Sequence, residues 1–198
     1  MTQELIFATG NANKVKEIQA ILGNAYSIKS LKDIAQKQAK GDIILKEPFD
    51  TLEANAKTKA EQLKEISGQD CFAEDSGLFV NGLNGEPGVF SARYSGENAT
   101  DSSNIELLLK NLKDKEDKTA YFKTVIHLIK DEQHFTFTGT CEGKIIASPI
   151  GENGFGYDPI FIANAIPQRS FAQLTKEEKN TISHRAKATA LFAKHLNP

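Results

Sequence analysis

The chain has 198 residues, 39% of them hydrophobic, which is enough to bury one core. We therefore expect a single domain over 1–198, with two lobes at most. Lys and Arg total 24 against 26 Asp and Glu. This near balance argues against nucleic acid or a membrane surface as a partner, so any anion must be bound locally.

The N-terminal residues run directly into a short apolar strand, so we expect neither a signal peptide nor a membrane span. Cys71 and Cys141 are too few and too scattered for a disulfide framework or a structural zinc site. Both features predict a cytoplasmic protein.

The first quarter of the chain is predicted to form a strand, a tight loop and a helix. Residues 5–8 are apolar, residues 9–11 have turn chemistry, and apolar residues then recur at helical spacing until Gly23. A second helix is predicted over 51–66, with Asp50 as its cap.

Later segments predict a mixed α/β fold. Apolar and alternating patterns predict a strand at 71–73 that ends in Glu74-Asp75, a helix over 105–112, paired strands at 121–129 and 134–138, and further strand character at 142–146 and 159–162.

The helical tail is predicted to break before Arg185. Lys179 and Arg185 are six positions apart, roughly 600° around a continuous helix, and would point to different sides. If Thr175 and Glu178 form a capping box and Ser183 caps a new helix, the break brings the basic residues to one site.

Two segments suit phosphate and metal chemistry. Thr9 to Lys14 combines a glycine, Asn side chains, a helix start and a lysine, an arrangement that suits phosphate, although an ordinary strand-to-helix turn fits it equally well. Glu47, Glu74 and Asp75 are oxygen ligands suited to magnesium. The alternative for each carboxylate is a solvated surface group.

Two other segments suit a purine base. Phe155 lies between two glycines and precedes Asp158, so it can stack on a base, or pack inward as part of a glycine-rich turn. Lys179, Ser183, His184 and Arg185 offer donors to phosphate or a keto oxygen, or form a solvated helix start. The other histidines have no metal-ligand spacing and are interpreted as structural: His127, His134 and His195.

Taken in order, these segments resemble the inosine triphosphate pyrophosphatase family, the non-canonical purine nucleotide pyrophosphatases. The matching stretches span nearly the whole chain: TGNANK at 9–14, EPFDTLEANAKTKA at 47–60, EDSGL at 74–78, GEPGVFSARYSG at 85–96, GFGYDPIF at 154–161 and LTKEEKNTISHRAKA at 174–188. No single stretch is specific, but their order is.

The resemblance implies a role for each matched residue. Glu47 and Asp75 would hold Mg²⁺, with Asp75 also the general base; Glu74 replaces the Asp of many relatives, which leaves its share in metal binding open. The substrate would be bound by Thr9, Gly10, Asn11, Ala12, Asn13, Lys14, Ser76, Phe155, Gly156, Tyr157, Asp158, Lys179, His184 and Arg185.

The resemblance also implies a fold and an activity. The fold would be a long, bent mixed β-sheet flanked by helices, in two lobes with a central active-site cleft, usually as a homodimer. The reaction would release pyrophosphate from inosine, deoxyinosine or xanthosine triphosphate. Two alternatives stay open: a pyrophosphatase for pyrimidine or modified nucleotides, and a nucleotide-binding module without turnover.

Overall fold

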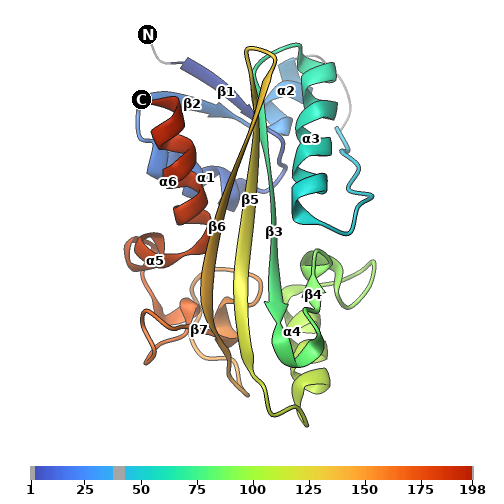
Figure 1. Ribbon diagram of the computed structural model, residues 1–198, viewed down its shortest axis with the longest axis vertical. Coiled ribbons are helices and arrows are strands. Elements are labelled where there is room, and N and C mark those ends of the chain that lie inside the picture. Colours follow the sequence, from blue (N-terminus) through green and yellow to red (C-terminus); the bar gives the residue numbers. More distant parts are fainter. Residues whose placement is uncertain (1–2, 38–42, 198) are drawn as a thin grey trace. The chain divides into compact units, whose positions relative to one another are not determined.

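The computed structural model describes residues 3–37 and 43–197, and its architecture is α/β (Figure 1). The seven-stranded sheet has the order β2-β1-β3-β5-β6-β7, and β4 pairs with β3. β1 is parallel to β2 and β3, whereas β4 and β7 are antiparallel to their neighbours β3 and β6. The predicted mixed sheet flanked by helices is confirmed.

The main elements are β1 Gln3–Phe7, α1 Ala12–Leu22, β2 Tyr26–Lys29, α2 Leu31–Lys37, α3 Leu52–Ser67, β3 Cys71–Val80, β4 Pro87–Gly88, α4 Asp101–Leu112, β5 Thr119–Lys130, β6 Gln133–Ile145, β7 Phe161–Ala163, α5 Lys176–Ile182 and α6 His184–Leu196.

The chain divides into two compact units. Unit 1 comprises the described residues within 1–75, 124–139 and 186–198, and unit 2 comprises 76–123 and 140–185. Strands β3, β5 and β6 each contribute residues to both units. That the whole chain is one domain stays a prediction.

Unit 1 has an apolar layer on each face of its strands. Leu5 and Phe7 of β1 pack with α1 and α6, while Ile6 and Ala8 pack with α2 and α3. Figure 1 shows the two helix pairs on opposite sides of these strands. The alternation follows from the two-residue period of a strand, which sends successive side chains to opposite faces.

Unit 2 has its own core. It is built by α4, by the residues of β3, β5 and β6 that belong to unit 2, and by the segment around β7. Phe161 packs edge-on against both Phe122 and Phe171, with ring centroids 4.7 and 4.9 Å apart. Each unit therefore buries enough apolar surface to hold its own polar side chains in place.

Several element boundaries differ from the sequence prediction. β3 runs on to Val80, so Glu74 and Asp75 lie inside the strand and not at its end. Thr51, not Asp50, caps α3, because its side chain accepts a hydrogen bond from the Ala54 amide. Residues 142–145 belong to β6, and residues 158–160 form a 3₁₀ turn before β7. β2 and α2 were not predicted.

The predicted break in the tail is confirmed. Thr175 and Glu178 form a capping box at the start of α5, which ends at Ile182. Ser183 is extended, with φ −68° and ψ 154°, and α6 begins at the next residue. Among the helices of residues 3–37 and 43–197, none combines the length and apolar character needed to span a bilayer.

Candidate functional site

The loop between β1 and α1 joins the features predicted for phosphate. Asn11 caps the helix: its side-chain oxygen accepts from the amides of Asn13 and Lys14 at 2.9 and 3.4 Å. The Thr9 hydroxyl accepts from the Asn11 amide at 3.1 Å. Among the described residues, apart from its chain neighbours, no atom lies within 4 Å of where a Cβ on Gly10 would stand, and the loop is exposed there.

Strand β3 sends its two neighbouring carboxylates to opposite faces of unit 1. Glu74 lies 3.2 Å from the ammonium of Lys14 on α1. Asp75 shares the face of Cys71 and Ala73, which pack against the α3 side. This alternation separates Glu74 from Asp75, so the two side chains do not form one ligand pair.

Lys59 of α3 is a site residue that the sequence analysis did not single out. Its ammonium bonds to Glu47, to the main-chain oxygen of Glu74 at 2.8 Å and to Asp75 at 3.4 Å. It is buried. A signal existed in the sequence: Lys59 falls on the apolar stripe of the predicted helix, where a cation requires an acidic partner.

Side-chain amides of α3 position the segment that carries Glu47. Asn55 donates to the carbonyl and accepts from the amide of Phe49, both at 2.9 Å. Gln62 makes the same pair of bonds with Lys46, both at 3.0 Å. The amides of Asn55 and Gln62 thus bond four main-chain groups of a segment that belongs to no strand. We call these two pairs of bonds the amide clamps, and Glu47 lies between them in the sequence.

Burial and neighbouring charges shift the pKa of Asp75. Burial raises the pKa of Asp75, and Glu47 raises it further, while Lys59, Lys14 and a hydrogen bond from Asn55 lower it; the net pKa lies above its usual value. Glu47 and Asp75 both contact the ammonium of Lys59, and Glu74 contacts that of Lys14. Carboxylate oxygens are donors that fit a hard divalent cation.

In unit 2, the glycine-rich loop is folded around the carboxylate of Asp158. Its Oδ2 accepts from the Phe155 amide at 3.0 Å. Gly154 has φ +81°, and a Cβ there would collide with that same oxygen, so glycine is required. The Gly156 amide donates to Asp101 at the start of α4, at 2.6 Å. Asp158 therefore shapes the loop with this oxygen, and Phe155 is left half-buried.

Two cations lie over the ring of Phe155. Lys179 is 5.1 Å and Arg185 5.6 Å from the ring centroid, within cation–π range. Lys179 also bonds to Asp158 at 2.6 Å, and Arg185 reaches the Ser76 hydroxyl at 3.5 Å. The break between α5 and α6 thus brings Lys179 and Arg185 to the same ring, as the sequence predicted.

The other predicted residues of this half are packed into unit 2. His184 stacks on Phe122, with ring centroids 4.7 Å apart. Tyr157 is buried and donates its hydroxyl to the carbonyl of Ser91 at 2.9 Å. These contacts fix the orientation of both rings.

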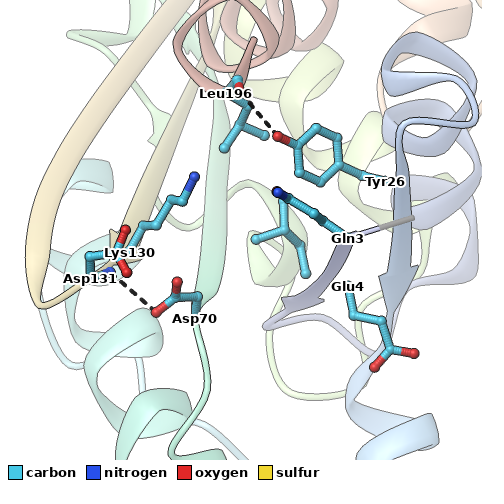
Figure 2. Close-up of a pocket in the computed structure, with 8 residues that line it drawn as sticks. Gln3, Glu4, Tyr26, Asp70, Lys130, Asp131 and Leu196 are labelled. Atoms are coloured by element: carbon cyan, nitrogen blue, oxygen red, sulfur yellow. Dashed lines mark hydrogen bonds between the residues drawn. The ribbon is translucent and has the colours of Figure 1, made fainter. Parts of the chain in front are cut away.

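A polar hollow in unit 1 involves none of the predicted site residues (Figure 2). Within it, Tyr26 donates to the Leu196 carbonyl at 3.0 Å and the Asp131 amide donates to Asp70 at 3.3 Å. These polar groups satisfy one another, and the hollow adds nothing to the site. Its lining residues are Gln3, Glu4, Leu5, Tyr26, Asp70, Lys130, Asp131 and Leu196.

A helix-start loop beside buried acids, together with an aromatic ring under two cations, defines an α/β protein that handles nucleotides. A family model agrees with that class across almost the entire sequence. The chain belongs to the Ham1 family, whose model matches residues 5–195.

Relatives and solved structures cover the same length. The chain is 48% identical to a dITP/XTP pyrophosphatase of Flavobacterium psychrophilum, over 94% of this chain and 95% of the relative. It is 45% identical to one of Christiangramia forsetii, over 98% and 99%. The structure of the Staphylococcus aureus Ham1 protein matches with a TM-score of 0.86 at 39% identity, covering 98% of each chain.

Proposed function

We propose that this protein hydrolyses non-canonical purine nucleoside triphosphates, namely those of inosine, deoxyinosine and xanthosine, to the monophosphate and pyrophosphate. The observation that carries the proposal is the contact of the buried Lys59 with the buried Asp75 and the half-buried Glu47, in a chain whose relatives are named dITP/XTP pyrophosphatases. The enzyme class is thus a hydrolase acting on phosphoanhydride bonds.

Glu47 and Asp75 are the residues that would hold Mg²⁺. Both carboxylates already converge on one cation, the ammonium of Lys59, and carboxylate oxygens are the donors that magnesium prefers. When bound, the ion would neutralise phosphate charge. Glu74 faces Lys14 on the other side of β3, so we propose that it positions that lysine and is not a ligand.

Asp75 is proposed as the general base. Burial raises the pKa of Asp75, which makes its carboxylate a stronger base than an ordinary aspartate, while the nearby ammonium of Lys59 favours the ionised form. Asp75 would take a proton from water as the water oxygen attacks the α-phosphorus. The bond between the α-phosphorus and the bridging oxygen breaks, and pyrophosphate leaves with the electron pair.

The phosphate and base ends of the nucleotide are assigned to different units. In unit 1, Lys14 and the amides and side chains of residues 9–13 would contact the phosphates. In unit 2, Phe155 would stack on the purine, and Arg185 would donate to a 6-keto oxygen. Because Asp158 Oδ2 is engaged within the loop, we assign recognition of the base edge to the loop amides and to the charged donors.

A substrate panel tests this proposal. Inosine, deoxyinosine, xanthosine, adenosine, guanosine and uridine triphosphates would be incubated with and without Mg²⁺, and pyrophosphate and orthophosphate measured separately. We expect pyrophosphate from the first three, only with the metal. Equal or better use of uridine triphosphate would point to a pyrimidine enzyme, and intact inosine triphosphate after hours would point to a binding module.

The setting of the activity is also a proposal. Cys71 and Cys141 are buried and form no disulfide, which suits a reducing cytoplasm, and the family resemblance implies a homodimer. Light scattering on the purified protein should give twice the mass of the 21.7 kDa chain. A monomer mass at working concentration would contradict the dimer but leave the chemistry untouched.

A further inference from the structure

The hairpin of β5 and β6 brings two imidazoles together in unit 1, with ring centroids 5.2 Å apart and ring planes tilted by 57°. Its turn contains Asp131 and Glu132 with φ of 50° and 60°, and it places His127 and His134 diagonally across the two strands. His127 Nε2 lies 3.0 Å from His134 Nδ1. This is a hydrogen bond, in which one nitrogen donates to the lone pair of the other. When the proton of His134 is on its Nε2 instead, both lone pairs point into the same space, where a metal ion can replace the shared proton.

Thr136 completes the geometry. Its hydroxyl oxygen lies 3.0 Å from His127 Nδ1, the ring nitrogen that faces away from His134. When Nδ1–H donates to this oxygen, Nε2 carries no proton and is a ligand. A hydrogen bond behind a histidine in this way fixes its tautomer and ring orientation at metal centres.

One member of the pair is accessible from solvent. His127 is buried, while His134 and Thr136 are exposed at the surface of the hairpin. Solvent therefore reaches the exposed ring, and the buried ring offers its Nε2 when its Nδ1–H donates to Thr136.

We propose that His127 and His134 form a binding site for a divalent transition-metal ion of the Zn²⁺ type, independent of the proposed hydrolase function. Zinc–nitrogen bonds of about 2.0–2.1 Å in tetrahedral geometry place two nitrogens about 3.3 Å apart, a few tenths from the present separation. Within the described residues no third His, Cys, Asp or Glu joins the pair, so water fills the remaining positions.

Calorimetric titration of Zn²⁺ into the full-length protein, without nucleotide, tests the site. We expect one equivalent to bind, and His134→Gln to weaken binding at least about tenfold. His195→Gln is the matched control, because His195 is another exposed histidine, beside Phe135 and Phe137, and it should leave the affinity unchanged. Mg²⁺ should not compete, since imidazole suits zinc better than magnesium.

The thiols do not provide an alternative site. Both are buried, and burial raises the pKa of Cys71 to about 12, so its thiolate is absent at neutral pH.

In the calorimetric titration, no Zn²⁺ binding to the wild type, or unchanged binding in His134→Gln, would overturn the proposal.

A second measurement needs no change in the ligands. Imidazole ¹⁵N spectra of the wild type should show coordination shifts at His127 Nε2 and His134 Nδ1 when Zn²⁺ is added. Thr136→Val, which keeps a β-branched residue in the strand, should weaken binding about tenfold by removing the supporting oxygen. Shifts confined to His195, or none, would contradict the proposed site.

Discussion

The two units use lysine in different surroundings. In unit 1, Lys59 contacts both Glu47 and Asp75. In unit 2, Lys179 pairs with Asp158, and both Lys179 and Arg185 lie over the ring of Phe155. Carboxylate oxygens suit a cation and an aromatic ring suits a base, so changes in the two units should damage different steps.

The largest expected effect comes from Asp75→Asn. Without the base, kcat should fall about 10³-fold at unchanged fold, measured as pyrophosphate release from inosine triphosphate. Asp70→Asn is the matched control just before the same strand: it removes the charge of a partly exposed contact with Lys64 at 3.3 Å, keeps an acceptor oxygen for the Asp131 amide, and activity should persist. More than a tenth of wild-type kcat in Asp75→Asn would remove this residue from the chemistry.

Lys59→Met should lower kcat about 100-fold and alter its pH dependence. The ammonium lowers the pKa of Asp75, so its loss must raise that pKa further and move the acid limb of the pH–rate profile to higher pH. Lys57→Met, on the same helix but with an exposed side chain 3.8 Å from Glu61, provides the control. An unshifted acid limb would show that Lys59 does not act through Asp75.

A change in the base half should act on KM. Phe155→Ala removes the stacking surface, and since base stacking contributes about 1–3 kcal/mol, we expect KM for inosine triphosphate to rise about tenfold or more with kcat nearly constant. Phe155→Tyr retains a ring and should stay close to wild type. A loss confined to kcat would contradict the assignment of Phe155 to substrate binding.

The smallest effect is expected at the support of the glycine-rich loop. Asp101→Ala removes the acceptor of the Gly156 amide, and the loss of about 1 kcal/mol of loop order should raise KM about fivefold. Asp101→Asn keeps an acceptor oxygen and should recover most of the affinity. Equal KM values for Asp101→Ala and wild type would mean that Asp158 alone holds the loop.

Local signals predicted the parts of the fold that local chemistry determines. Periodicity and capping predicted the strand, loop and helix at the start, the break at Ser183, and a helix over 105–112 that the structure extends to Asp101–Leu112. β2 and α2 are short, at four and seven residues, and give little periodicity to read. The predicted end of β3 was wrong for another reason: two adjacent carboxylates are typical of the end of a strand, but here they lie inside it.

The carboxylates of β3 are tolerated inside a strand because helices on both faces supply lysines. Lys14 reaches Glu74 from one face and Lys59 reaches Asp75 from the other. Neither pairing can be read from one segment, since each joins residues far apart in the chain. The same limit explains why the resemblance suggested Glu47 and Asp75 as ligands while Lys59, which joins them, was missed.

The amide clamps of Asn55 and Gln62 give the Glu47 segment its own local stability. Among the described residues this stretch pairs with no strand and is held by the bonds of Asn55 and Gln62, with Ile43 and Leu45 packed against the core, so we expect it to open before the sheet does. In hydrogen exchange, the amides of Lys46 and Phe49 should then open at lower free energy than those of β3. One proposed magnesium ligand would thus rest on a segment that unfolds separately, and the other on the sheet itself.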